Sequence, residues 1–263
     1  MGISYTAPPT PSRWHSERRI IWAGLSLIVL AVAAWEAVHL WEIIGAQGAI
    51  GVDPVFYQDM GRRWLETGTF YTERQLSGPY ETTTLIDNLY PPIALYLFVP
   101  FVFLPLILWW VIPLAIVASV VWYVRPVAWS WPILALVIAL PKTVSATIYG
   151  NSDLWVAAAV AGGVVLGWPA ILAAFKPSLV FFALIGINRI SWWFMAAILV
   201  VLSRPLLPLW LQYPDVIRNS TSTAAYSIGN LPFMSLPILA VLFSRHRSPF
   251  KRIRDAPGGS TRG

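Results

Sequence analysis

Apolar residues arrive along this chain in blocks that Pro, Gly and short charged clusters separate. The first block runs from about Ile20 to Ile44, and the others follow Tyr90. A transmembrane α-helix needs roughly 20 predominantly apolar residues to cross the hydrocarbon core, whereas strands of a transmembrane barrel are shorter and alternate in polarity. The pattern therefore predicts an all-α protein, a polytopic transmembrane helical bundle.

The placement of basic residues predicts the orientation of this bundle. Clusters of Arg and Lys mark cytoplasmic segments, and here they gather at the two ends of the chain: Arg13, Arg18, Arg19, Arg245, Arg247, Lys251, Arg252 and Arg254. We therefore expect both termini in the cytoplasm and an even number of crossings. One helix per block gives seven, so one block must form a hairpin of two short helices, for about eight helices in total.

Two blocks are candidates for this hairpin. One is broken between residues 100 and 105, and the other at Lys176-Pro177. We favour the second, because it leaves Arg125 and Arg189 cytoplasmic and puts Lys176 on the same side as an acidic loop that follows the first helix.

Three segments are expected along the chain. Residues 1–19 form a cytoplasmic N-terminal segment, residues 20–244 form the transmembrane domain, and residues 245–263 form a basic, partly disordered cytoplasmic tail. The loop 45–91 carries six acids against three arginines, which is typical of an extracytoplasmic face. The first apolar run lacks a small-residue cleavage site, so we expect a retained helix and not a signal peptide.

Composition supports an integral membrane protein. The chain is 57% hydrophobic and 11% charged, with a mean hydropathy of +0.64, whereas a soluble domain is roughly 25% charged. The net charge of +6 comes from the two basic ends and follows the positive-inside pattern, so we expect membrane lipids and no nucleic acid as partners. Cys is absent and the three histidines are scattered, so we expect no metal and no cofactor.

The segment "IGVDPVFYQDMGRRWLETGTFYTE", which starts at Ile50, mixes acids, bases and aromatics directly after the first apolar block. We predict a helix with Asp53 at the N-cap, Pro54 at the first helical position and Gly68 at its end. An N-cap carboxylate has a depressed pKa. One face carries Phe56, Met60 and Trp64, and the other carries Asp59, Arg62, Arg63 and Glu66. Such an amphipathic helix is expected to lie in the interface plane and to roof a cavity that opens to lipid.

Several short motifs resemble the GT-C class of polytopic glycosyltransferases. In chain order they are Asp53, "ETGTFY", "YPPIALYLFVPFVFLP", "GNSDLW" and "AAFKPSLVFF". The likeness is closest to glycosyltransferase family 87 and spans about residues 20 to 190. In that family an Asp follows the first helix, Tyr-Pro-Pro opens the second, Gly-Gln-x-Asn opens a middle helix, and a Lys and a Pro follow. Here Asn151 stands in place of Gln and Asp153 in place of Asn, and the chain is shorter than is typical of the family.

This resemblance implies a GT-C-like fold and an inverting, metal-independent transfer of mannose or a similar sugar. The donor would be a polyprenyl-phosphate-linked sugar, and the acceptor an envelope glycolipid or polysaccharide. The expected location is the cytoplasmic (inner) membrane of a bacterium, with the active site on the external face. Asp53 takes the place of the general base that removes the acceptor's hydroxyl proton.

The departing phosphate requires positive groups, and sugar hydroxyls require hydrogen-bond partners. Lys176 is the first candidate for the phosphate, because a lysine inside an apolar block is costly unless it has a function or reaches the interface. The remaining candidates for substrate binding are Arg62, Arg63, Tyr90, Asn151 and Asp153. Each has a structural alternative: the arginines contact lipid phosphates, Tyr90 anchors the interface, and Asn151 and Asp153 cap the next helix.

Two further groups of polar residues stand out. Glu36, His39 and Glu42 follow at three-residue spacing in the first apolar block, so their side chains lie near the same helix face. We favour an inter-helix hydrogen-bond network for them, with a proton relay as the alternative. Asp215 and Arg218 are expected to form an i,i+3 surface pair.

Two other function classes remain open at this stage. A carrier or flippase of lipid-linked sugars would need polar groups along the whole bundle, whereas here they concentrate between residues 45 and 91 and at a few membrane positions. A non-catalytic partner subunit would fit the short chain. Retention of Asp53, Tyr90 and Lys176 favours the enzyme, because a charge inside lipid is costly to keep without a use.

Overall fold

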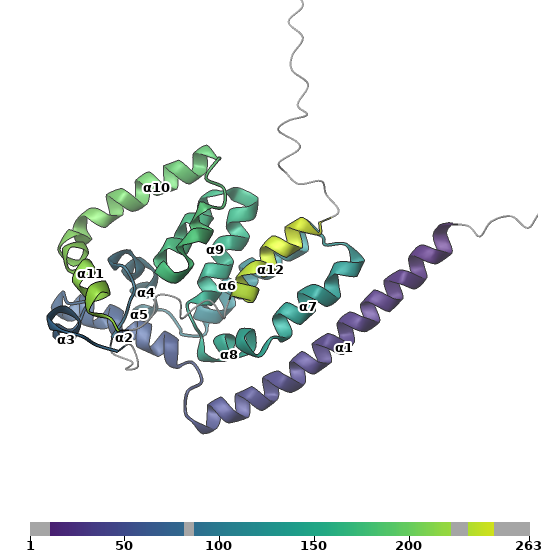
Figure 1. Cartoon of the computed structure of the whole chain (residues 1–263), viewed down its shortest axis with the longest axis horizontal. Helices are drawn as coiled ribbons and strands as arrows, with labels where there is room; N and C mark the ends of the chain where they lie inside the picture. The colour runs from purple at the N-terminus through teal and green to yellow at the C-terminus, as the bar shows by residue number, and fades with distance from the viewer. Residues whose placement is uncertain (1–10, 82–86, 222–230, 245–263) are drawn as a thin grey trace, which may run out of the picture.

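The regular structure in the described part of the chain consists of helices joined by loops, without β-strands. The structure is a computed structural model, and it describes residues 11–81, 87–221 and 231–244 (Figure 1). The all-α prediction is confirmed over these ranges. The expected tail, residues 245–263, lies outside the described residues.

The elements follow one another with short connections. The α-helices are α1 (Pro11–Ala46), α2 (Val52–Thr67), α3 (Glu73–Ser77), α4 (Leu95–Phe98), α5 (Pro100–Phe103), α6 (Leu108–Val124), α7 (Trp131–Ala139), α8 (Pro141–Tyr149), α9 (Asp153–Leu166), α10 (Ile190–Ser203), α11 (Leu207–Asn219) and α12 (Leu231–Leu242). The 3-10 helices are η1 (Pro92–Ala94), η2 (Ala128–Ser130), η3 (Trp168–Phe175), η4 (Pro177–Leu184) and η5 (Arg204–Leu206).

Membrane-spanning length is reached by a few of these helices. Among the described residues, two are long and apolar enough by themselves, over Glu17–Ala46 and over Ile190–Asn219. Two bent pairs raise the number to four: Pro92–Phe103 with Leu108–Val124, bent by 118°, and Ala128–Ala139 with Pro141–Tyr149, bent by 55°. Membrane association is thus indicated, and a bundle of about eight crossings stays a prediction.

Both blocks that were candidates for a hairpin are broken, and in each the residue before a proline is extended. Leu104 precedes Pro105 with φ −92° and ψ 150°, and Lys176 precedes Pro177 with φ −120° and ψ 104°. A proline ring clashes with a helical residue before it, so a helix ends there. On either side of Lys176, η3 and η4 pack against each other, whereas the other block contains the pair bent by 118°. Which of the two blocks forms the membrane hairpin stays a prediction.

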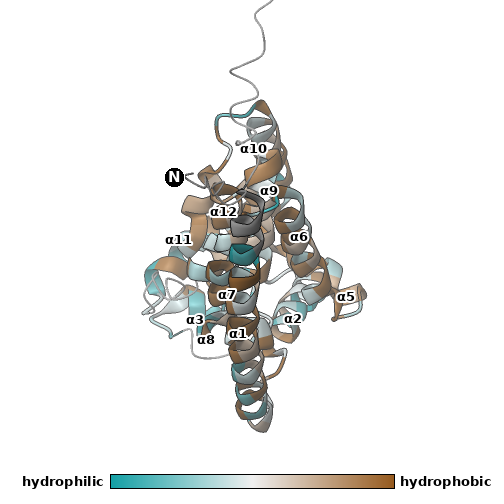
Figure 2. Ribbon diagram, turned by 90° about the vertical axis from the view of Figure 1, so that its right-hand side faces the viewer, coloured by the Kyte–Doolittle hydropathy of each residue, from teal (hydrophilic) through white to brown (hydrophobic). Residues whose placement is uncertain are grey.

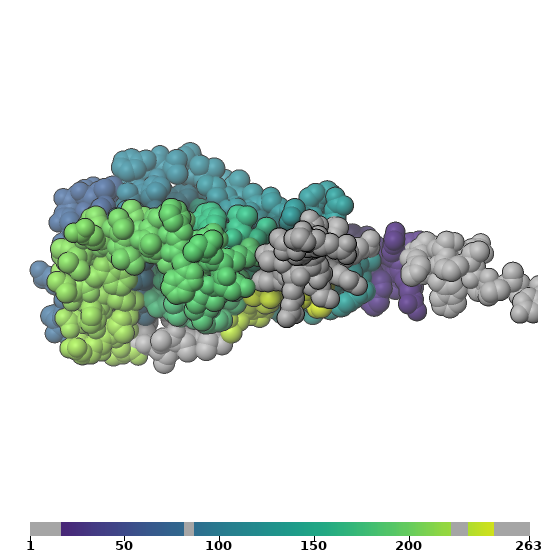
Figure 3. Space-filling model, turned by 90° about the horizontal axis from the view of Figure 1, so that it is seen from above, coloured from purple at the N-terminus to yellow at the C-terminus, as the bar shows by residue number. Residues whose placement is uncertain are grey.

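The centre of the bundle is α9, which is buried along nearly its whole length. It packs against α6, α12 and η3. In contrast, α1 packs only along one side, against α7, α8 and η2, and its hydrophobic middle is otherwise open (Figure 2). Seen from above, the N-terminal part of α1 protrudes beyond the rest of the molecule, and α10 and α11 form the wall at the opposite end (Figure 3).

The amphipathic helix predicted after the first block is α2, with one correction. Gly68 ends it, as predicted, but Gly51 is the N-cap and Asp53 lies inside the first turn. Gly51 adopts the left-handed conformation at φ 66°, and its N–H donates to the carbonyl of Ile148. Glycine is the residue that takes this conformation at no steric cost, so the helix starts two residues earlier than the Asp-Pro pair suggested.

The two faces of α2 are confirmed in outline. Met60 is buried and Phe56 and Trp64 are half-buried, while Asp59 and Glu66 are exposed. The buried face rests on α4, α5 and α8. The placement of α2 in a membrane interface stays a prediction.

The loop between α2 and η1 is fixed by polar contacts at both ends. A capping box joins Thr72 and Gln75 at the start of α3, and Arg74 forms an ion pair with the buried Asp87. Tyr80 pairs with Ser220 at the end of α11. These contacts position Tyr90, which follows the loop.

We expect the substitution Gly150→Ala to lower the free energy of unfolding by about 2–5 kcal/mol. Gly150 is left-handed, with φ +73°, and an added Cβ would lie 2.5 Å from Cγ of Pro54. Gly48→Ala is the matched control, because Gly48 has φ +65° but no neighbour within 4 Å, so only the backbone cost of about 1–2 kcal/mol applies. Denaturant titration in micelles measures both, and equal losses would contradict the predicted contact between α2 and the α8–α9 joint.

Candidate active site at the start of the buried helix

The joint between α8 and α9 brings two distant segments together. Gly150 ends α8, and Asn151 and Ser152 lead into α9. The hydrogen bond from Gly51 N–H to the carbonyl of Ile148, at 3.0 Å, holds the start of α2 beside this joint. Asp53 therefore lies next to Asn151, although 98 positions separate them in the sequence.

Asn151 bridges a carboxylate and an ammonium. Its Nδ2 donates to Oδ2 of Asp53 at 2.7 Å, and its Oδ1 accepts from Nζ of Lys176 at 2.8 Å. Lys176 also donates to Oδ1 of Asp153 at 2.6 Å. Only this orientation of the Asn151 amide places its NH2 group on the carboxylate of Asp53 and its oxygen on the ammonium of Lys176. We call Asp53, Asn151, Asp153 and Lys176 the polar cluster.

Asn151 also forms a local hydrogen bond at the start of α9. Its Oδ1 accepts from the backbone N–H of Asp153 at 3.1 Å, but the N-cap position of α9 belongs to Ser152 and not to Asn151. The side chain of Asp153, by contrast, serves as the partner of Lys176.

The ion pair in the cluster is fully buried. The side chain of Lys176 is 1% exposed and that of Asp153 is 0% exposed. Removing an ion from water costs several kcal/mol, so each of these charges requires the other. Lys176 thus does not reach the interface as a snorkelling lysine, and its charge is matched by Asp153.

Of the two carboxylates in the polar cluster, that of Asp53 is the less buried. Burial raises its pKa above the ordinary value of 3.8, and the charge of Asp153 adds to this, while the hydrogen bond from Asn151 and the charge of Lys176 lower it. The expectation of a depressed pKa for an N-cap is therefore wrong, because Asp53 does not cap the helix and is largely desolvated. A raised pKa makes its carboxylate a stronger base than that of an exposed Asp.

Hydroxyl groups form a second network beside the cluster. The hydroxyl oxygens of Tyr57 and Tyr90 lie 2.9 Å apart, and that of Tyr90 lies 2.7 Å from Oγ of Ser152. Tyr71 donates to the carbonyl of Tyr90 at 2.9 Å. Burial and then the charge of Asp53 raise the pKa of Tyr57 well above its ordinary range, so its hydroxyl stays neutral.

Sequence reasoning missed Tyr57 and Ser152. Tyr57 follows Asp53 by four residues, which puts both on the same face of α2, and this spacing was the available signal. Ser152 lies inside the quoted "GNSDLW", but nothing in the sequence shows that its hydroxyl meets Tyr90.

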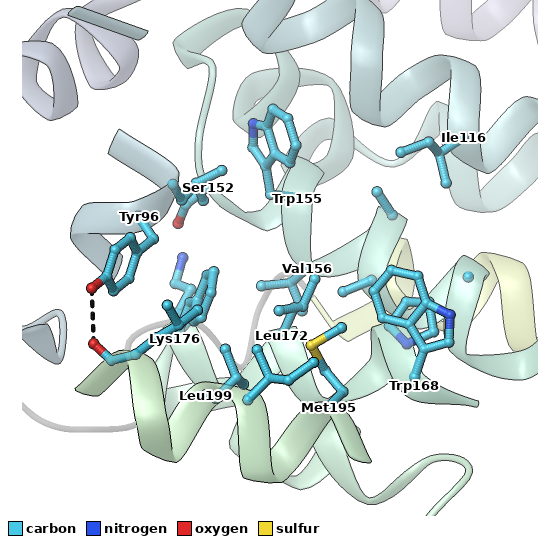
Figure 4. Close-up of a pocket in the computed structure, with 18 of the residues that line it drawn as sticks. Tyr96, Ile116, Ser152, Trp155, Val156, Trp168, Leu172, Lys176, Met195 and Leu199 are labelled. Carbon is cyan, nitrogen blue, oxygen red and sulfur yellow. Dashed lines mark hydrogen bonds between the residues drawn. The ribbon is translucent and has the colours of Figure 1, made fainter. Parts of the chain in front are cut away.

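A cavity of about 670 Å³ opens between α4, α9, η3 and α10. Tyr90, Ser152 and Lys176 line one end, and nearly all other lining side chains are apolar. Figure 4 shows Lys176 and Ser152 together at one end and Trp168 at the other. At the rim, the hydroxyl of Tyr96 donates to the carbonyl of Leu202 at 2.8 Å and joins α4 to α10 (Figure 4).

The two arginines expected at the substrate phosphate lie elsewhere. Arg62 is exposed and pairs with Asp59 at 3.3 Å. Arg63 donates to the carbonyl of Phe70 at 2.7 Å and so fixes the turn after α2. Arg62 thus lies on the exposed side of α2, and Arg63 is half-buried beside Phe70 and not in the polar cluster. Among the described residues, no group of three or more His, Asp or Glu side chains is placed to hold a metal ion.

The buried pair yields a stability prediction. We expect Lys176→Met to lower the free energy of unfolding by about 3–5 kcal/mol, because it leaves Asp153 buried and uncompensated. The double variant Lys176→Met/Asp153→Leu is expected to recover most of this loss. Lys142→Met, at an exposed lysine of α8, is the control and should change stability by less than about 0.5 kcal/mol. A double variant as unstable as the single one would show that the ion pair is not the cause.

Comparison with known proteins leaves the site to be judged by its own geometry. No protein-family model, no curated protein and no solved structure matches the chain.

Proposed function

We propose that this protein is a membrane glycosyltransferase that uses Asp53 as its general base. The observation that carries the proposal is the position of Asp53. Its largely desolvated carboxylate is linked through the amide of Asn151, by two hydrogen bonds, to a lysine at the end of an apolar cavity. A base, a cation and an apolar channel are the three parts that transfer from a lipid-phosphate donor requires.

The cavity suits the lipid chain of such a donor. Its volume of about 670 Å³ falls within the roughly 300–1,000 Å³ of ligand pockets, and its apolar walls suit an isoprenoid chain. The polar end offers the ammonium of Lys176 and the hydroxyls of Ser152 and Tyr90 as donors to phosphate oxygens. Because Lys176 is paired with Asp153, we expect the phosphate to compete with Asp153 for it.

The transfer itself is a single displacement. The acceptor hydroxyl oxygen forms a bond to the anomeric carbon of the sugar, and the bond from that carbon to the phosphate oxygen breaks. The hydroxyl proton passes to the carboxylate of Asp53, and the electron pair leaves with the polyprenyl phosphate, whose charge Lys176 stabilises. Attack opposite the leaving group inverts the anomeric configuration.

The identity of the substrates rests on the likeness to glycosyltransferase family 87. It points to mannose or a similar sugar as the group transferred and to an envelope glycolipid or polysaccharide as the acceptor. It also points to the outer face of a bacterial inner membrane as the location.

The proposal predicts sugar transfer that depends on Asp53. Purified protein in lipid is given radiolabelled polyprenyl-phosphate-mannose and a crude glycolipid acceptor pool, and we expect label in a new product. Asp53→Asn should reduce the rate at least about 100-fold, the usual contribution of a general base. Asp59→Asn is the matched control, an exposed acid of the same helix, and should keep its activity.

Two outcomes would contradict the proposal. Full activity in Asp53→Asn would exclude this base. No transfer by the wild-type protein from an intact donor would favour a non-catalytic partner subunit or a carrier of lipid-linked sugars.

The pH dependence of transfer provides a separate test. A base acts only when deprotonated, so activity should fall as the pH drops through the pKa of Asp53, which lies above 3.8. Asn151→Ala removes the hydrogen bond that lowers this pKa, so the acidic limb should move to higher pH, while Asp59→Asn should leave it in place. The logarithm of kcat/KM against pH measures the limb, and an unchanged limb in Asn151→Ala would mean that another group titrates.

A further inference from the structure

A second hollow adjoins the apolar cavity. It is a groove of about 350 Å³ between α6 and α9. Its lining includes Ala115, Ile116 and Ser119 of α6 and Gly162, Val165 and Leu166 of α9. Ile116, Gly162 and Leu166 also line the cavity, so the two hollows are continuous. We call the second one the α6–α9 groove.

The groove lies at the opposite end of the cavity from Lys176. Ser152, which lines the cavity beside Lys176, directly precedes α9, whereas Leu166 is the last residue of this helix. Figure 4 shows Ile116 and Trp168 on the side away from Lys176 and Ser152. At about 1.5 Å per helical residue, the cavity extends roughly 15–20 Å along α9 before it meets the groove.

Two other sides of the cavity offer no comparable passage. At the rim, α4 and α10 are joined by the hydrogen bond from Tyr96 to the carbonyl of Leu202, at 2.8 Å. A depression near Ile198 is lined by α10 alone, so it is a hollow on one helix and not a gap between two. The groove, in contrast, has exposed residues on both of its helices, such as Ala115 and Leu166, and opens to the outside of the bundle.

The path from Lys176 to the groove suits a lipid with an anionic head. The ammonium pairs with a phosphate, and the apolar walls beyond it suit a hydrocarbon chain. A chain longer than roughly 20 Å, the length of the cavity along α9, does not end inside it and has to continue into the groove. A long polyprenyl phosphate has such a chain, whereas the short chain of geranyl phosphate ends within the cavity.

We propose that the α6–α9 groove is the exit through which the isoprenoid chain of the donor passes from the cavity into the bilayer. This inference rests on the proposed function, because the donor is the lipid phosphate of the proposed transfer. It adds the path of the chain, with the phosphate at the start of α9 and the distal isoprenoid units beside α6. The site therefore accepts donors whose chains are longer than the cavity.

Binding of lipid phosphates, without sugar transfer, tests the proposal. The whole chain in lipid nanodiscs is given radiolabelled undecaprenyl phosphate, the long probe, or geranyl phosphate, the short one. Ala115→Trp fills the groove, so the long chain has no exit and its phosphate does not settle beside Lys176. We expect the affinity for undecaprenyl phosphate to fall at least about tenfold, the size of a 1.4 kcal/mol change, and the affinity for geranyl phosphate to stay unchanged.

Ala118→Trp is the matched control. Ala118 is also an exposed alanine of α6, but it lines a separate cavity that α1, α7, α8 and α12 share with α6. Both affinities should keep their wild-type values in this variant. Ser119→Trp, one turn after Ala115 in the same groove, repeats the test, and thermal unfolding of each variant checks that the fold is kept.

A photoreactive group at the distal end of the undecaprenyl chain locates the exit directly. We expect its crosslinks in residues 115–120 of α6 and 162–166 of α9, which border the groove.

The outcomes separate this inference from the proposed function. Equal losses of affinity for both lipids in Ala115→Trp, or no loss for either, would overturn the exit and leave the proposed donor standing. Crosslinks in residues 194–202 would also overturn it, because the chain would then leave across α10. Binding of neither lipid by the wild-type protein would overturn the proposed donor, and the exit with it.

Discussion

The ion pair between Lys176 and Asp153 is the interaction on which the site depends. A lysine in the apolar centre of a helical bundle is unstable without an opposite charge, and Asp153 at the start of α9 supplies it. The pair ties the break between η3 and η4 to the most deeply buried helix of the molecule. Because Lys176 also donates to Asn151, the same contact fixes the amide that holds Asp53. Loss of the pair would therefore disturb the position of Asp53 as well as the core.

Around this pair the fold separates two chemical environments. On one side the cluster ends at the half-buried Asp53 of α2, and on the other it ends at Lys176 in the wall of an apolar cavity. The uncharged amide of Asn151 lies between them and fixes both side chains by hydrogen bonds. A hydroxylated acceptor and a lipid-linked donor could thus approach from different sides, which is the arrangement that the proposed transfer needs.

The surrounding aromatic residues keep this arrangement rigid. Tyr57 stacks on Phe98 with ring centroids 4.7 Å apart and meets Trp109 at 5.0 Å, and its hydroxyl reaches Tyr90. Buried aromatic pairs of this kind add about 0.5–1.5 kcal/mol beyond the area that they bury. They fix α2 to the bundle, so Asp53 is held by packing as well as by its hydrogen bond.

The sequence by itself determined the helical, membrane-associated character, the break at Lys176-Pro177 and the end of α2 at Gly68, because apolar block length, proline and glycine act locally. It also identified Asp53, Asn151, Asp153, Lys176 and Tyr90, which the fold brings together. The tertiary structure alone decided that Gly51 caps α2, that Arg62 and Arg63 bond elsewhere, and that Tyr57 and Ser152 adjoin the cluster. The raised pKa of Asp53 and the neutralised charge of Lys176 were likewise invisible in the sequence. Both follow from burial and from partners remote in the chain, which local patterns do not encode.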